Sequence, residues 1–450
     1  MSATTAPKVS VNWKYTIIFG LWFASWFVIW GTYNSYIPVI FQSGNPDFNQ
    51  MGASKAVGFG LGAFITGIIM SLDNLSIVLL QPIFGNISDR AKSRKRMVVI
   101  GGLLAAVCYL ALPFGFLSIP ADQSGNLSAL IPYFLLTIVA ASAMIFSWSF
   151  ALPAENGLKF LLVPSGARTQ VWSFIAFLGG IAFVATFMTS NMLYNIHPGL
   201  PFWVGGGFLL LVVLLYALFI KEPANVVVDR GEDNEERGLG NLLSGLKSFP
   251  KEDLSALLTI SLVKFFAIFG VAAIETFGVS YIINVLGVPE GSAAMNVAIY
   301  FVGYLIAAIP AGFLANRFGR KNMLRAALIL FIVMAVVQIS LNSLALLLPV
   351  LILIGVANGI TDVMCVPMAT EMVPSKKVMG VTLGTMAAIT SLASVISVPF
   401  WGGMIEATGN NFRVIFIALI VGPLLGLLLS FRLKGNTGEA RPVLAEETKW

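Results

Sequence analysis

Residues 71–90, SLDNLSIVLLQPIFGNISDR, indicate the architecture of the chain, because the end of this segment recurs in the second half. An apolar run there leads to Gly85 and then to Asp89 and Arg90, which a basic cluster follows. Residues 312–321, GFLANRFGRK, repeat that order after another apolar run. The displacement is close to half of the 450 residues, which indicates a duplicated unit.

A second repeated loop supports the duplication. Val163-Pro164-Ser165 precedes Arg168 in the first half, and Val373-Pro374-Ser375 precedes Lys376 in the second half. Both repeats occupy equivalent positions between apolar runs. Parallel repeats related by an axis along the membrane normal are an architecture of transporters.

The composition excludes a water-soluble protein. Hydrophobic residues make up 57% of the chain and charged residues only 11%, with a mean hydropathy of +0.87. Soluble domains carry roughly 25% charged residues, so this chain could not cover a water-exposed surface. Cys108 and Cys365 lie far apart in apolar runs, and His197 is the one histidine. We therefore expect neither a metal site, nor a cofactor, nor an enzyme.

Apolar segments long enough to cross a bilayer organise the chain. We predict an all-α integral membrane protein with twelve spans in two six-helix repeats. The expected spans are 15–41, 57–86, 97–119, 131–153, 168–192, 200–220, 254–286, 292–314, 323–341, 344–368, 378–401 and 412–432. The corresponding domains are a tail at 1–14, bundles at 15–220 and 254–432, a linker at 221–253 and a tail at 433–450.

The basic residues predict the orientation. All but three of the 27 lysines and arginines fall in segments on one side of the expected spans, the exceptions being Lys55, Lys264 and Arg413. The positive-inside rule then places both termini in the cytoplasm of a cell-membrane protein. Topology thus accounts for the net charge of +6, and no nucleic-acid partner is needed.

The duplicated loop in a chain of six and six spans resembles the major facilitator superfamily, over about residues 15 to 430. Residues 71–90 are similar to the sucrose/proton symporter-like and glycoside–cation symporter branches. The resemblance implies that Gly85, Asp89, Arg90, Gly312 and Arg317 belong to gating loops. One departure is that Asn316 stands where the first half has Asp89. The alternative for the basic residues is that they only set topology.

Four ionisable residues fall inside the expected spans: Asp73, Lys264, Glu275 and Asp362. Such residues are costly in a bilayer and indicate function or a structural ion pair. Lys264 lies ten residues from the inner end of its span, about 15 Å deep, and Asp362 lies at a similar depth. The resemblance implies that their spans line a central cavity. We therefore expect these two side chains to pair.

The remaining acidic residues, Asp73 and Glu275, lack a basic partner in the sequence. A carboxyl in a low-dielectric site without such a partner can be neutral at pH 7 and can carry a proton. Oxygen ligands near Asp73 would equally suit Na⁺. The residues do not decide between H⁺ and Na⁺, and the resemblance favours H⁺.

Span one carries aromatic side chains with an amide beside them. Flat rings stack on the C–H face of a sugar while polar groups bind its hydroxyls. The same rings can instead anchor or pack the helix. The expected substrate contacts are Trp30, Tyr33, Asn34, Trp148 and Tyr300.

These features predict a monomeric secondary transporter that moves a small polar solute, a sugar or glycoside, by cation symport through alternating access. Its partners would be the solute, the cation and the lipid bilayer. Proton-coupled export of amphipathic drugs is the alternative that an aromatic, Met-rich cavity also allows. A more remote alternative is a membrane receptor that does not transport.

Overall fold

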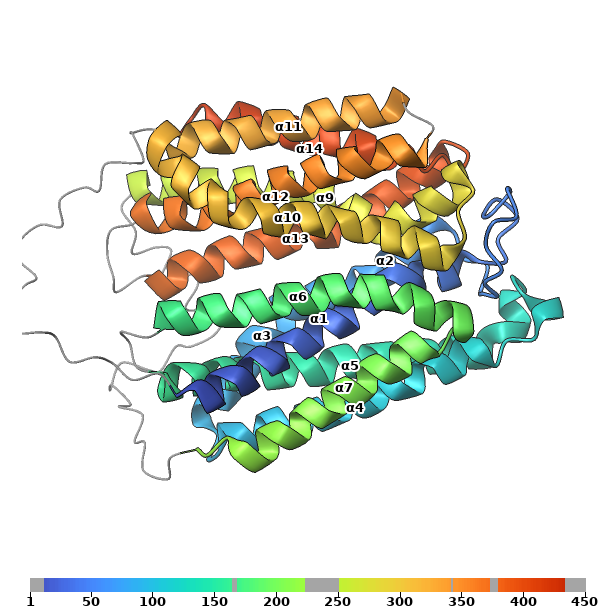
Figure 1. Ribbon diagram of the computed structural model, residues 1–450, viewed down its shortest axis with the longest axis horizontal. Helices are drawn as coiled ribbons and strands as arrows, with labels where there is room; N and C mark the ends of the chain where they lie inside the picture. Colours follow the sequence, from blue (N-terminus) through green and yellow to red (C-terminus); the bar gives the residue numbers. More distant parts are fainter. Residues whose placement is uncertain (1–11, 164–167, 223–250, 341–342, 373–378, 434–450) are drawn as a thin grey trace, which may run out of the picture. The chain divides into compact units, whose positions relative to one another are not determined.

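The computed structural model describes residues 12–163, 168–222, 251–340, 343–372 and 379–433. In this part of the chain the regular structure is helical, with no β-strand (Figure 1). The first half contains α1 (Trp13–Gln42), α2 (Ala63–Met70), α3 (Leu72–Arg90), α4 (Arg94–Leu117), η1 (Ala121–Gln123), α5 (Leu127–Leu162), α6 (Arg168–Ile196) and α7 (Leu200–Phe219). The second half contains α9 (Lys251–Leu286), α10 (Glu290–Phe318), α11 (Arg320–Ser340), α12 (Leu344–Met372), α13 (Met379–Ala407) and α14 (Val414–Ser430).

Each of the twelve expected spans is helical in the described part of the chain. Eleven helical segments there are long and apolar enough to cross a membrane, and Val414–Ser430 is a shorter apolar helix. A helix satisfies its backbone donors and acceptors internally, as hydrocarbon surroundings require. The chain is therefore a multi-pass membrane protein, which confirms the prediction from composition.

The second span consists of two helices, where the sequence predicted one. α2 ends at Met70, α3 begins at Leu72, and Ser71 connects them. The Ser71 hydroxyl donates to the carbonyl oxygen of Ile68 at 2.8 Å. Serine hydroxyls that bond to the preceding turn tend to bend helices, which explains a break in a continuous apolar run.

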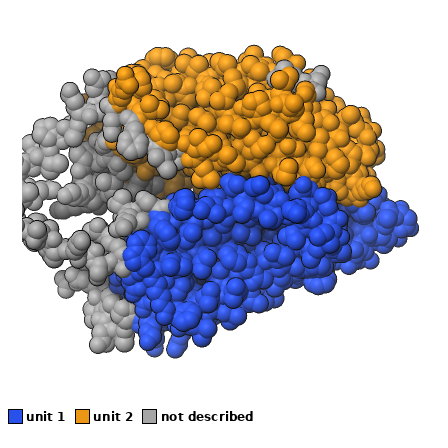
Figure 2. Space-filling view, viewed as in Figure 1, with its two compact units in different colours: residues 1–40, 57–59, 76–238 blue, residues 41–56, 60–75, 239–450 orange. Residues whose placement is uncertain are grey.

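The chain divides into two compact units, which Figure 2 colours separately. Unit 1 comprises residues 1–40, 57–59 and 76–238, and unit 2 comprises residues 41–56, 60–75 and 239–450. Unit 2 therefore includes the end of α1, all of α2 and the start of α3. The boundaries of the two six-helix bundles expected from the sequence, at 15–220 and 254–432, remain predictions.

Each compact unit has its own set of packed helices. In unit 1, α4 packs against α5 and α7. In unit 2, α9 contacts α10, α12, α13 and α14, and α10 packs closely on α12. α9 is thus the helix of unit 2 that brings its neighbours together, and its side chains meet those of several other helices.

α2 packs against α13 inside unit 2. A Cβ at Gly67 would lie 2.7 Å from a backbone carbonyl oxygen of α13, and a Cβ at Gly402 would overlap that of Ala63. Glycines at these positions allow the two backbones to approach closely. The Glu406 carboxylate accepts a hydrogen bond of 2.8 Å from the backbone N–H of Phe64 in the first turn of α2. It thereby satisfies one of the donors that a helix start leaves open.

Candidate functional site

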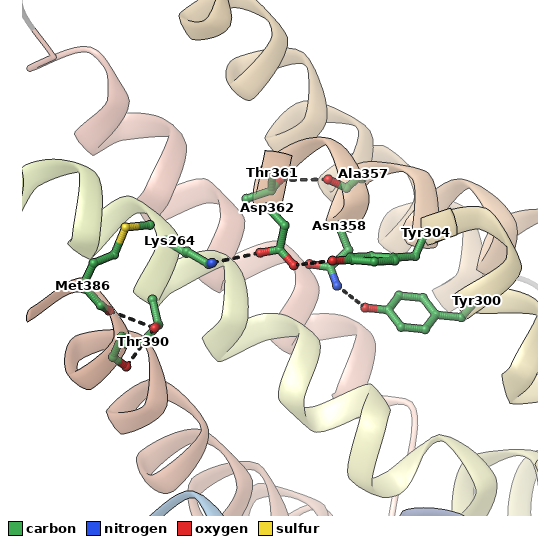
Figure 3. Close-up of polar contacts among 10 residues, drawn as sticks. Lys264, Tyr300, Tyr304, Ala357, Asn358, Thr361, Asp362, Met386 and Thr390 are labelled. Carbon is green, nitrogen blue, oxygen red and sulfur yellow. Dashed lines mark hydrogen bonds and ion pairs between the residues drawn. The ribbon is translucent and has the colours of Figure 1, made fainter. Parts of the chain in front are cut away.

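An ion pair joins two helices of unit 2 at the centre of the candidate site. Lys264 Nζ on α9 lies 3.1 Å from Asp362 Oδ1 on α12. The Tyr304 hydroxyl on α10 donates to the other carboxylate oxygen of Asp362 at 3.0 Å (Figure 3). The contact that equal depth and the family resemblance predicted is present, and Tyr304 joins it as a third member.

A second polar connection runs beside the first. The Asn358 amide donates to the Tyr300 hydroxyl at 2.6 Å, and that hydroxyl donates to Glu275 Oε1 at 3.5 Å. Asn358 stands one turn before Asp362 on α12, and Tyr300 one turn before Tyr304 on α10. Side chains four residues apart share a helix face, so the two tyrosines make successive hydrogen bonds between α10 and α12.

Two glycines on α12 allow α10 and α12 to approach closely at these hydrogen bonds. A Cβ at Gly355 would overlap the carbonyl oxygen of Tyr300, and one at Gly359 would lie 2.6 Å from that of Tyr304. Gly355 and Gly359 form a G-x-x-x-G pattern, which lets helices in membranes approach closely. The close approach brings each tyrosine within reach of a polar side chain on the opposite helix. The sequence pattern thus creates the geometry of the site.

The ion pair is partly exposed. The side chain of Lys264 is 15% exposed and that of Asp362 is 30% exposed. Complete burial would impose a large desolvation cost on both charges, whereas here each charge has a partner and some access. On the far side of Lys264, the Thr390 hydroxyl of α13 donates to the carbonyl oxygen of Met386, so it serves its own helix (Figure 3).

Comparison with known proteins assigns the chain to a family. The model of the Major Facilitator Superfamily matches residues 15–291 and 260–449, which together cover most of the chain. The chain belongs to the Major Facilitator Superfamily. This confirms the resemblance drawn from the duplicated loops, and the helical fold in two repeats agrees with it.

Sugar and nucleoside transporters are among the similar proteins. The raffinose permease of Escherichia coli is 28% identical over 222 residues, which are 48% of this chain and 44% of the permease. The chain thus matches less than half of that relative's length.

Solved structures share the fold. The nucleoside transporter NupG superposes with a TM-score of 0.71 at 12% identity, covering 94% of this chain and 99% of that one. The D-xylose–proton symporter has a TM-score of 0.67 at 13% identity, covering 96% and 100%. These relatives are transporters, which confirms the expectation that this superfamily member is not an enzyme.

The aromatic residues of span one pack inside unit 1. The Trp148 ring of α5 is stacked between Trp22 and Trp26 of α1, with ring centroids 5.0 and 4.4 Å away. Trp30 stacks on Phe183 of α6 at 5.3 Å. The sequence left open whether these rings bind sugar or pack the helix, and the contacts of Trp148 on both faces are those of a packing residue.

The other two expected substrate contacts of α1 differ in burial. Tyr33 is buried, whereas Asn34 is partly exposed. The Asn34 amide donates to the carbonyl oxygen of Trp30 at 3.0 Å, one turn back in its own helix. Tyr300, which is expected to contact the substrate, is buried and hydrogen-bonded to Glu275 and Asn358.

A buried ion pair in unit 1 lies beyond the span that the sequence predicted. Lys159 Nζ contacts Glu155 Oε2 at 2.8 Å, one turn apart on α5, and both side chains are buried. The expected span ended at residue 153 and placed Lys159 in an inner loop. α5 continues to Leu162, so the charge lies on the helix instead. The sequence reasoning stopped the span where the apolar run met its first charge.

Several expected site residues lie outside the described side chains: Asp73, Asp89, Arg90 and Gly312. At Gly85 no atom among the described residues lies within 4 Å of the place that a Cβ would take. Arg317 is exposed at the end of α10, with its guanidinium 5.4 Å from the centre of the Phe318 ring. The described residues contain no cluster of metal-binding side chains.

Proposed function

We propose that the protein is a secondary transporter that moves a sugar or glycoside by proton symport through alternating access. The observation that carries the proposal is the polar cluster of unit 2, where an ion pair, a further carboxyl and two tyrosines lie among apolar helices. Charges at this depth are costly and indicate a substrate or ion pathway. The likeness to a raffinose permease and to the fold of a D-xylose–proton symporter supports a sugar.

Glu275 is the proposed proton carrier of this cluster. Its carboxyl accepts a hydrogen bond from Tyr300, whose hydroxyl also accepts one from Asn358. A neutral carboxylic acid crosses an apolar region at less cost than a carboxylate, so protonation favours the occluded state. Asp73 is proposed to share the binding of the cation. Lys264 and Asp362 form the pair that would open and close as the transporter changes state.

The remaining assignments follow from the sequence. The protein is proposed to lie in the cell membrane, and the concentration of lysines and arginines on one side of the spans predicts that both termini are in the cytoplasm. Trp30, Tyr33 and Asn34 are proposed to face the substrate from α1, with Trp148 behind them. The gate is proposed to use Gly85, Asp89, Arg90, Gly312 and Arg317. The working transporter is proposed to be a monomer in the bilayer.

Transport into proteoliposomes tests the function. The full chain is reconstituted and counterflow is measured with labelled raffinose, D-xylose and a nucleoside. A pH gradient that is acidic outside should accelerate uptake of at least one sugar. Symport should make the outside medium more alkaline as sugar is added, and acidification would instead indicate the antiport of an exporter.

A glutamate variant tests the coupling step. Glu275→Gln should retain counterflow but lose acceleration by the pH gradient, because an amide carries no proton. Glu252→Gln is the matched control, since it makes the same change at an exposed position of the same helix. Unchanged coupling in Glu275→Gln would remove Glu275 from the mechanism, and counterflow of no tested solute would refute a sugar transporter.

A further inference from the structure

The ion pair of unit 2 has unused hydrogen-bonding capacity. A lysine ammonium has three N–H donors, and a carboxylate has about four acceptor positions. Among the described residues, Lys264 pairs with Asp362, and Asp362 contacts Lys264 and the Tyr304 hydroxyl. Donors therefore remain on Lys264 and acceptor positions on Asp362, and both side chains are partly exposed. The pair can thus accept a ligand while its charges stay paired.

The chemistry of the pair selects the kind of ligand. A hydroxyl both donates and accepts, so one hydroxyl can donate to Asp362 while its neighbour accepts from Lys264. An anion would compete with Asp362 for the lysine, and a cation would compete with Lys264 for the carboxylate. Either competitor leaves one charge without a partner, which is costly at this depth. A neutral molecule with adjacent hydroxyls avoids that cost.

Tyr304 makes the carboxylate a fixed acceptor. Its hydroxyl holds Asp362 Oδ2 while Lys264 holds Oδ1, so the carboxylate is bound from two helices. A group that is already oriented loses less freedom on binding a ligand. The G-x-x-x-G contact of α12 with α10 fixes the position of Tyr304 in turn. The acceptor positions that stay open therefore point in fixed directions.

We infer that Lys264 and Asp362, with Tyr304 as a positioning residue, form a binding subsite for two adjacent hydroxyl groups of a neutral polyol. This inference rests on the proposed sugar transport and names the part of the substrate that unit 2 recognises. It separates two tasks inside one cluster. Glu275 with Tyr300 serves the cation, and the ion pair with Tyr304 binds the sugar.

Binding to the purified full chain tests the subsite. Calorimetry measures the Kd of raffinose and of D-xylose, and then of monodeoxy derivatives of whichever sugar binds. The variant is Lys264→Gln with Asp362→Asn, which removes both charges together and leaves neither unpaired. In the unaltered protein, loss of a contacting hydroxyl should raise Kd about 10- to 100-fold, as expected for hydrogen bonds to charged groups.

The double variant distinguishes a subsite from a structural ion pair. It should bind the parent sugar about 10- to 100-fold more weakly, and the sensitive deoxy derivative should then bind about as well as the parent. Equal sugar binding by the variant and the unaltered protein would overturn the subsite while leaving the transport proposal intact. If the unaltered protein binds neither sugar and transports none, the proposed function fails and the subsite with it.

A labelling experiment covers the case in which the variant does not fold. The unaltered protein is treated with an amine-reactive reagent with and without raffinose or D-xylose, and modified lysines are quantified by mass spectrometry. The bound sugar should slow the labelling of Lys264 several-fold and leave that of Lys251, an exposed lysine at the start of α9, unchanged. Equal labelling of Lys264 with and without a bound sugar would overturn the subsite.

Discussion

Replacing Gly359 with alanine is expected to separate α12 from α10 and to disconnect Tyr304 from Asp362. The new Cβ would lie 2.6 Å from the carbonyl oxygen of Tyr304 and 3.2 Å from the Cβ of Ala307. Neither neighbour is the flexible end of a side chain. The clash therefore has to be relieved by movement of the helices, because close-packed backbones do not rotate out of the way.

The size of this effect follows from the contact distances. Ordinary van der Waals contact begins at 3.4 Å, so the two backbones must move apart by about 0.8 Å at this turn. The Tyr304–Asp362 hydrogen bond is 3.0 Å long, already at the upper end of the O–H···O range. Part of that displacement is enough to break it. Overpacking and the lost hydrogen bond together should cost about 2–4 kcal/mol of stability.

The assay is thermal unfolding of purified protein in detergent, combined with sugar binding. Gly207→Ala on α7 is the matched control, because nothing lies within 4 Å of its new Cβ. An unhindered exchange of glycine for alanine in a helix should raise stability by about 0.5–1 kcal/mol. Gly359→Ala should thus melt well below the control and bind sugar less tightly. Equal melting temperatures and equal binding in the two variants would refute the reasoning.

Three further substitutions have defined outcomes. Tyr304→Phe should weaken sugar binding about tenfold by freeing Asp362, whereas Tyr281→Phe, which also removes a tyrosine hydroxyl from unit 2, should leave binding unchanged in the same calorimetric titration. Lys264→Met should lower the free energy of unfolding by about 3–5 kcal/mol, because it leaves the Asp362 charge without its lysine. Adding Asp362→Leu should restore most of that loss, as measured by denaturant unfolding. If stability is not restored, the two charges do not stabilise each other. Trp148→Ala should cost about 3–5 kcal/mol, since its ring fills the space between two others, and a melting temperature close to that of the unaltered protein would show that this stack is dispensable.

The sequence predicted features that depend on distance along one helix. The equal depths of Lys264 and Asp362 followed from the constant rise per residue of a helix, whereas the meeting of their two helices came from the family resemblance. Tyr304 could have been found from the same pattern, since it lies one turn after Tyr300 and faces the glycines of α12. The break at Ser71 could not be predicted from the hydrophobic pattern, because a serine is also compatible with a continuous helix.

Other features depend on which helices meet. The sequence of α1 allows its tryptophans either to bind sugar or to pack, and only the position of Trp148 on α5 shows that Trp22 and Trp26 stack on that ring. Likewise, the contact of the Glu275 carboxyl with Tyr300 arises from the approach of α10 to α9. The hydrophobic periodicity of a single helix does not reveal which residues of other helices it contacts.

The attachment of α2 to α13 has a consequence for dividing the chain into fragments. A C-terminal fragment that starts at residue 239 would lack residues 41–56 and 60–75, which belong to its own compact unit. Gly402 and Glu406 would then lose the helix against which they pack. The C-terminal fragment is therefore not expected to fold on its own. Co-expression of both fragments should produce a stable protein through complementation, whereas the C-terminal fragment alone should be degraded.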